Sequence, residues 1–150
     1  MTTASQFCTF YLDGALFAVE VDRVQEVLRY QDMTNVPLTS EVIEGLINLR
    51  GQIVTAIDLR RRLSLPARPA GSQPMNVVVR TEGDIVSLLV DEIGEVLEVP
   101  DDAFEHTPST LQGPAKQLVQ GVYKLDGSLL LLLDVQHTMQ FDPNVEAIEH

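Results

Sequence analysis

Residues 45–59, GLINLRGQIVTAIDL, and residues 121–135, GVYKLDGSLLLLLDV, are two copies of one pattern, and this similarity decides the fold. Both copies have glycine at the same two positions, and Asp58 of the first aligns with Asp134 of the second at an offset of 76 residues. Self-similarity of this kind fixes the architecture before any single motif does.

A second pair of segments repeats in the same order. Residues 13–28, DGALFAVEVDRVQEVL, and residues 82–97, EGDIVSLLVDEIGEVL, share an acidic-Gly start and the frame V-D-x-x-x-E-V-L at an offset of 69 residues. A repeat of roughly 70 residues that occurs twice is too long for a solenoid, whose periods are about 20–50 residues with at least three copies. The pattern therefore predicts two copies of one small domain.

Four X-Gly dipeptides separate short apolar runs, as in β-hairpins, where glycine tolerates the positive φ of the turn. They are Asp13-Gly14, Arg50-Gly51, Glu82-Gly83 and Asp126-Gly127. Two hairpins and one further strand per half are enough to form a small barrel with few open edges, so we expect an all-β protein. The glycines expected in structural turns are Gly14, Gly45, Gly83, Gly121 and Gly127.

Helix is expected to be a minor component. Residues 21–28 predict a short helical turn followed by a strand, and residues 58–63 predict one helical turn after a strand. The Pro- and Gly-rich stretch at 66–74 favours an exposed loop. We place the first barrel at 1–66, the loop at 67–74 and the second barrel at 75–150, with limits that can interleave if a terminus crosses to its neighbour.

The bulk composition excludes several classes of partner. The chain has 150 residues, 45% of them hydrophobic, and a formal charge of −12, which repels nucleic acid and anionic lipid. Cys8, the single cysteine, cannot form an intramolecular disulfide, so a reducing compartment is favoured. Residues 1–10 lack the features of a signal peptide, and residues 129–133 are too short to span a bilayer. We expect a cytoplasmic protein without direct membrane insertion.

The residues give no sign of a catalytic centre, cofactor or metal site. Cys8 is expected to be a buried structural thiol, and Asp134 and His137, at i and i+3, a surface pair. No phosphate-binding glycine motif follows a strand. The cluster Arg60–Arg62 can either solubilise the end of a strand or dock an acidic partner. A loose acidic run can be a solvated face or attract a cation or basic partner; it comprises Glu92, Glu95, Glu98, Asp101, Asp102 and Glu105.

Residues 45–60 resemble the signature G-x-x-N-L-R-G-x-I-x-x-x-x-D-L-R of CheW-like domains. Residues 24–27 match the V-x-E-[IV] segment of that family, and Val90-Asp91 with residues 95–97 matches its V-D-x-V-x-x-V-L segment. The resemblance extends over residues 6–140. It implies two intertwined five-stranded SH3-like β-barrels and a scaffolding activity without catalysis.

The resemblance also implies partners and a binding surface. The family couples the cytoplasmic hairpin tip of a methyl-accepting chemoreceptor to the regulatory domain of the chemotaxis histidine kinase, in membrane-associated receptor arrays. Other CheW-like molecules can join such assemblies in rings. Matched by position, the receptor-binding residues are Val24, Glu26, Asn48, Leu49, Arg50, Gly51, Val96 and Leu97. Our hypothesis for Arg50 is a charge-assisted bond to Glu26 that braces the groove, the alternative being a surface turn arginine.

Two other functions stay open at this point. The same fold can serve a different chemosensory system, such as one for surface motility or biofilm formation. A β-barrel that senses a small ligand is the rival of another class, and it would need a sizeable pocket with convergent polar groups.

Overall fold

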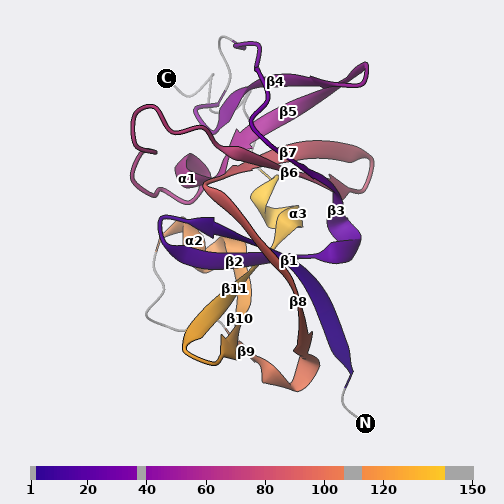
Figure 1. The fold of residues 1–150 in the computed structure, drawn as a ribbon, viewed down its shortest axis with the longest axis vertical. Helices are drawn as coiled ribbons and strands as arrows, with labels where there is room; N and C mark the ends of the chain where they lie inside the picture. The colour runs from indigo at the N-terminus through magenta and orange to yellow at the C-terminus, as the bar shows by residue number, and fades with distance from the viewer. Residues whose placement is uncertain (1–2, 37–39, 107–112, 141–150) are drawn as a thin grey trace.

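The structure is a computed structural model and describes residues 3–36, 40–106 and 113–140. The eleven strands within these ranges form two sheets. Figure 1 shows one sheet in each of two lobes, with α3 between them. The six-stranded sheet has the order β8 (Glu92–Pro100), β1 (Ala4–Leu12), β2 (Ala15–Glu20), β11 (Ser128–Leu133), β10 (Val119–Leu125) and β9 (Phe104–His106). The five-stranded sheet has the order β3 (Val24–Leu28), β6 (Met75–Thr81), β7 (Asp84–Val90), β5 (Gln52–Asp58) and β4 (Ile43–Leu49).

Short helical segments connect some of these strands. They are η1 (Val21–Arg23), α1 (Leu59–Arg62), η2 (Asp101–Ala103), α2 (Pro114–Leu118) and α3 (Val135–Thr138). The helical turn and strand predicted for residues 21–28 are η1 and β3, and the turn predicted for 58–63 is α1, so both predictions are confirmed.

The two sheets have the same strand order once the repeat is considered. The repeat matches the strands of the two copies one to one: β1 with β6, β2 with β7, β3 with β8, β4 with β10 and β5 with β11. When each strand is replaced by its counterpart, the order β8-β1-β2-β11-β10 of one sheet becomes β3-β6-β7-β5-β4, the order of the other sheet. Each sheet takes one hairpin from one copy and three strands from the other. The expected intertwined, all-β architecture is confirmed, with one addition: β9 gives one sheet a sixth strand.

Because of this exchange, the sheets do not follow the order of the chain. The predicted ranges 1–66 and 75–150 each contribute strands to both sheets. The hairpin β1–β2 joins the six-stranded sheet through β8 and β11, and β6–β7 joins the five-stranded sheet through β3 and β5.

Strands of different copies pair in two ways: β11–β2 and β5–β7 are parallel, whereas β1–β8 and β3–β6 are antiparallel, as are the four predicted hairpins. β11 pairs with β2 and β5 pairs with β7 in parallel, in the same register: Leu131 lies opposite Phe17, and Thr55 opposite Val86. All four X-Gly hairpin turns are present, with glycine φ values between 82° and 88°.

Gly45 and Gly121 do not lie in turns, so this part of the prediction is wrong. They lie inside β4 and β10, each beside a β-bulge. A Cβ on Gly45 would come 2.7 Å from the Thr34 carbonyl oxygen, and a Cβ on Gly121 would come 2.6 Å from that of Glu105. Both glycines therefore let a preceding segment approach the strand closely, in the same way in both copies.

The main hydrophobic core crosses the junction between the two sheets. Phe10 and Leu12 of β1 pack in one cluster with Val77 of β6 and Leu88 of β7, all at most 1% exposed. Val135 of α3 belongs to the same cluster, which agrees with the position of α3 in Figure 1. The two sheets are thus joined by a shared apolar interior.

Candidate protein-binding site and its supporting ion pairs

The turn between β4 and β5 presents Arg50 to Glu26 on β3. The guanidinium donates two hydrogen bonds, from Nη1 and Nη2 to the two carboxylate oxygens of Glu26, at 2.7 Å each. Such a two-pronged bond is directional as well as strong. The predicted charge-assisted bond between these residues is confirmed.

The local backbone fixes where Arg50 stands. Arg50 has a φ of 52° and Gly51 a φ of 88°, the pair of positive values that a type I′ hairpin turn requires. Asn48 stabilises this turn, because its Oδ1 accepts a hydrogen bond from the Gly51 N–H at 2.9 Å. Asn48 and Gly51 thus shape the turn, and the turn places the Arg50 side chain for its hydrogen bonds to Glu26.

The Arg50–Glu26 pair lies at the surface and remains charged. The Arg50 side chain is 74% exposed and that of Glu26 is 17% exposed. The hydrogen bond from Arg50 lowers the pKa of Glu26, and the bond to Glu26 raises the pKa of Arg50. The pair therefore presents fixed opposite charges beside the apolar residues of β3 and β5.

The predicted receptor-binding residues divide between the two sheets. The five-stranded sheet and its β4–β5 turn hold Val24, Glu26, Asn48, Leu49, Arg50 and Gly51. Val96 and Leu97 lie on β8, the edge strand of the six-stranded sheet. Val96 is 60% exposed, whereas Leu97 is partly buried against a smaller core cluster that contains Phe7 and Tyr123. Only Val96 of this pair therefore offers a largely free apolar side chain.

Two exposed apolar side chains on β3 and β5 were not predicted. Val27, next to Glu26 on β3, is 39% exposed, and Ile53, two residues after Gly51, is 60% exposed. Large exposed apolar side chains are typical of protein contact surfaces, although strand alternation turns Val27 to the face opposite Glu26. The signal was available in the sequence, since both residues alternate with inward-facing neighbours along predicted strands.

Two arginines of the cluster Arg60–Arg62 have a structural role that was not considered for them. The Arg60 side chain is only 9% exposed and donates to both carboxylate oxygens of Asp91, from Nε at 2.8 Å and Nη2 at 2.6 Å. Arg62 donates to the carbonyl oxygens of Thr138 at 2.8 Å and His137 at 3.1 Å, at the end of α3. Both side chains tie α1, which follows the five-stranded sheet, to segments next to the other sheet.

Asp91 joins the two sheets because the chain crosses between them there, from β7 to β8. Its Oδ2 also accepts the N–H of Asp13, in the β1–β2 turn, at 2.8 Å. Burial by itself would raise the pKa of Asp91, but the hydrogen bonds from Arg60 and Asp13 outweigh burial and hold the pKa below its ordinary value. Asp91 is therefore an ionised link in the junction.

The other candidates for chemistry have structural roles. Cys8 is partly buried in β1, and desolvation raises the pKa of its thiol, which disfavours the nucleophilic thiolate. Asp134 caps α3 by accepting the His137 N–H at 3.0 Å, and its Oδ2 lies 2.6 Å from His137 Nδ1, the i, i+3 pair that was expected. Within the described ranges no group of three or more His, Cys, Asp or Glu side chains could hold a metal ion.

The acidic run lies along β8, η2 and β9, at residues 92, 95, 98, 101, 102 and 105. All six of these residues are exposed, as on a solvated face. His150 lies outside the described residues. None of the helices in the described ranges is long and apolar enough to cross a membrane.

Comparisons with known proteins agree with this architecture. A family model described as a CheW-like domain matches residues 6–142. The chain is 27% identical to the chemotaxis protein CheW of Bacillus subtilis over 146 residues, covering 97% of this chain and 94% of that protein. It is 26% identical to the protein PilI of Pseudomonas aeruginosa over 114 residues, covering 76% of this chain and 64% of that protein.

The fold is also that of a solved relative. The crystal structure of the scaffolding protein TtCheW from Thermoanaerobacter tengcongensis superposes with a TM-score of 0.84 at 27% identity, covering 93% of this chain and 95% of that one. Together with the family match over most of the sequence, this places the chain without ambiguity. It belongs to the CheW-like domain family of non-catalytic scaffolding proteins.

Proposed function

We propose that this protein is an adaptor that couples the cytoplasmic tips of chemoreceptors to a chemotaxis histidine kinase. In this role it is a cytoplasmic protein that is recruited to membrane-associated receptor arrays. It contacts the receptor hairpin with the surface around the Arg50–Glu26 pair and the regulatory domain of the kinase with another face. Further CheW-like molecules extend the assembly into rings.

The observation that carries this proposal is the exposed, two-pronged Arg50–Glu26 pair on a shaped turn. A pair with Arg50 74% exposed contributes little to folding, since water and salt screen the attraction between exposed charges. Its geometry is nevertheless fixed by Asn48 and Gly51. A defined charged pair on a sheet that also exposes Val27 and Ile53 suits the recognition of an amphipathic helical hairpin, with polar contacts giving orientation and apolar contacts giving affinity.

The experiment measures co-sedimentation and titration of the protein with a soluble receptor-tip fragment and with the histidine kinase. We expect Arg50→Ala to weaken receptor binding by about tenfold, because Glu26 loses its partner and the surface loses its orientation. The matched control is Arg80→Ala, which removes an exposed arginine on β6. Unchanged receptor binding by a folded Arg50→Ala protein would remove Arg50 from the receptor surface.

A double-substitution cycle separates the pair from its members. If Arg50 acts by bracing Glu26, then Arg50→Ala combined with Glu26→Gln will bind the receptor fragment about as well as the weaker single variant. Independent, additive losses would mean that the two side chains contact the receptor separately.

The same module in a non-flagellar chemosensory system is a second candidate, favoured by the similarity to PilI. The two candidates share the scaffolding role and differ in their receptors. The genes beside this one discriminate between them: a flagellar receptor or kinase gene supports the first candidate, and genes for a surface-motility system support the second. Binding tests against receptor fragments from both systems give the biochemical answer.

A further inference from the structure

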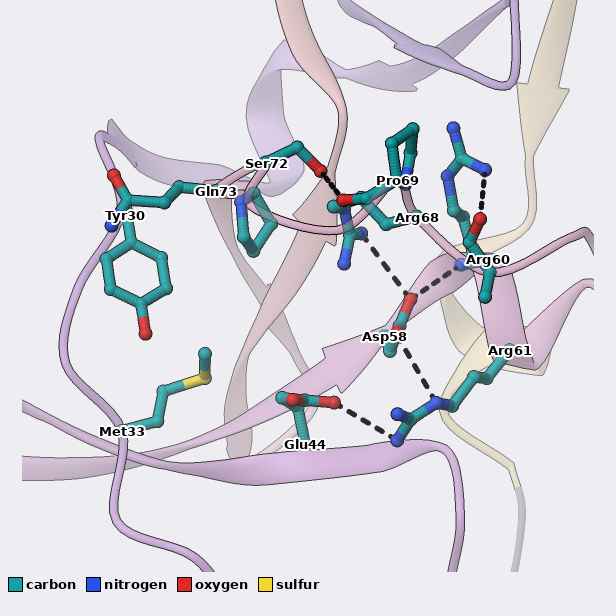
Figure 2. A pocket seen from close by; sticks show the side chains of 12 residues that line it. Tyr30, Met33, Glu44, Asp58, Arg60, Arg61, Arg68, Pro69, Ser72 and Gln73 are labelled. Atoms are coloured by element: carbon teal, nitrogen blue, oxygen red, sulfur yellow. Dashed lines mark hydrogen bonds and ion pairs between the residues drawn. The ribbon is translucent and has the colours of Figure 1, made fainter.

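A cavity of about 330 Å³ lies beside the 66–74 loop, away from the Arg50–Glu26 pair. Figure 2 shows arginines and acidic residues on one side of this cavity and Tyr30 and Met33 on the other. Its volume is near the lower end of the range for small-molecule sites, about 300–1,000 Å³. It is therefore large enough for a small organic ion or one side chain of a partner.

The cavity brings three arginines together in an acidic protein, and Asp91, which does not line it, balances part of their charge. Three of the ten Lys and Arg residues line it, namely Arg60, Arg61 and Arg68, against two acidic residues, Glu44 and Asp58. A chain of net charge −12 offers few such places to an anion.

Two of these arginines have acceptors for their hydrogen bonds. Arg60 donates to Asp91 and, from Nη1, to the carbonyl oxygen of Pro66 at 2.9 Å. Arg61 donates to the carbonyl oxygen of Glu41 at 3.0 Å and lies 3.1 Å from Glu44. The hydrogen bonds of these two guanidinium groups fix the segments that line the cavity.

Arg68 differs, because its side chain is only 13% exposed and its Nε and Nη2 are buried without a hydrogen-bond acceptor. Nε is 3.6 Å from an Asp91 oxygen, and Nη2 is 3.6 Å from an Asp58 oxygen. These separations balance charge but are too long for hydrogen bonds. Figure 2 shows the guanidinium beside the cavity, between the 66–74 loop and Asp58. Buried donors without an acceptor are rare in proteins, and an oxygen from outside the chain reaches them only when the guanidinium turns from these two carboxylates toward the cavity.

We propose that this cavity binds a carboxylate, held by the guanidinium of Arg68. The planar fork of arginine matches the two oxygens of a carboxylate, which a lysine ammonium cannot do. The apolar faces of Tyr30, Met33, Pro69 and Pro74 are placed to contact the carbon chain of the ligand. The carboxylate belongs either to a small organic acid or to an acidic side chain of a partner protein.

The test follows the Nε–H resonances of the arginines by NMR during titration of the full chain. The two probes are butyrate, for a small acid, and a blocked Ala-Glu-Ala tripeptide, for an acidic protein segment; butyramide, of the same shape but neutral, is the control ligand. We expect a saturable shift of the Arg68 resonance with a carboxylate probe, none with butyramide, and at least about tenfold weaker binding by Arg68→Gln. Arg80→Gln is the matched control variant and should bind like the unmodified protein.

The outcomes separate the two sources of the carboxylate. Tighter binding of butyrate supports a small acid as the ligand, and tighter binding of the tripeptide supports an acidic partner segment. Arg68→Lys keeps the charge without the fork, so it should bind more weakly than the unmodified protein and serves as the second variant if Arg68→Gln does not fold. The proposal is overturned if neither probe gives a saturable shift with the unmodified protein, or if Arg68→Gln or Arg68→Lys binds as tightly as the unmodified protein.

Discussion

At Arg60 a single buried side chain joins segments that are distant in the sequence. Its guanidinium reaches Asp91 at the crossing between the sheets and the carbonyl oxygens of Pro66 and Ala67 at the start of the 66–74 loop. The Asp91 carboxylate in turn binds the backbone of Asp13. The Arg60–Asp91 ion pair thus joins the two sheets in addition to the shared apolar core.

The repeat does not contain a second copy of this ion pair. At the offsets of the two repeated segments, Gln136 occupies the position equivalent to Arg60, and Asp22 the position equivalent to Asp91. A neutral glutamine cannot form an ion pair, so the Arg60–Asp91 pair has no counterpart at the equivalent positions of the repeat.

We expect Arg60→Met to destabilise the protein by about 3–5 kcal/mol, because it leaves the Asp91 carboxylate partly buried without its main partner. Urea denaturation measures the loss, with Arg80→Met as the control at an exposed position. If the loss comes from the uncompensated charge, adding Asp91→Asn to Arg60→Met will restore part of the stability. A double variant less stable than Arg60→Met alone would contradict this explanation.

The same link predicts a pH dependence of stability. The pKa of Asp91 is lower in the folded state than in the unfolded chain, so the unfolded state binds the proton more readily. The stabilisation from Asp91 is therefore complete above its unfolded pKa of about 3.9 and is lost as the pH falls through its folded pKa. Urea denaturation between pH 7 and pH 2 should show a smaller acid loss for Asp91→Asn than for the unmodified protein. Equal slopes for both would exclude Asp91 as a source of acid sensitivity.

The sequence predicted the Arg50–Glu26 pair but not the role of Arg60. The family motifs mark both residues of that pair, but they also mark Arg60 and Asp91, so membership of a motif did not by itself reveal the second pair. Arg60, Arg61 and Arg62 looked like a single basic cluster, yet successive residues of a helical turn point in different directions. Their partners, Asp91 and the end of α3, are brought to them only by the tertiary fold.

At the scale of elements, the glycines divide into two classes that the sequence does not distinguish. Gly14 occupies a hairpin turn at a φ of 82°, with open space where a Cβ would be. Gly45 and Gly121 lie in strands, where a Cβ would meet a backbone oxygen of a neighbouring segment. The turn glycines follow from the local X-Gly signal, whereas the strand glycines depend on contacts with Thr34 and Glu105, which no local pattern announces.

We expect Gly45→Ala and Gly121→Ala each to destabilise the protein by about 1–3 kcal/mol, because the added methyl group forces the neighbouring backbone away. Gly14→Asn is the contrasting variant, since asparagine tolerates positive φ and meets no neighbour there; its cost should stay below about 1 kcal/mol. Thermal unfolding of the three variants checks the order. A Gly45→Ala protein as stable as Gly14→Asn would show that the Thr34 segment yields easily.

The strand pairings show the same division between local and distant information. The four hairpins were predictable because turn and strands are contiguous in sequence. The parallel pairs β2–β11 and β5–β7 join different copies of the repeat, and no turn residue specifies them. The expected intertwined barrels were therefore right in class and in their hairpins, while only the fold shows which strands are exchanged.

At the scale of the whole molecule, the exchange makes the two sheets mutually dependent. The six-stranded sheet needs β1 and β2 from before the 66–74 loop and β8 to β11 from after it. The five-stranded sheet needs β3 to β5 from before the loop and β6 and β7 from after it. The core cluster containing Phe10 and Leu88 likewise draws on both parts. Cutting the chain in the loop separates strands that pair with each other, and not two finished domains.

We therefore expect fragments 1–70 and 71–150 to be unfolded when alone, because each retains strands of both sheets without their partners and exposes half of the shared core. Mixed in equal amounts, they should associate into a complex with the amide NMR spectrum of the intact chain, since the cut lies in a loop between β5 and β6 and removes no strand. Two separable barrels would behave differently: each fragment would give a dispersed spectrum by itself, and mixing would change neither. The same mixture tests the scaffold as a unit, because receptor binding should appear only when both fragments are present.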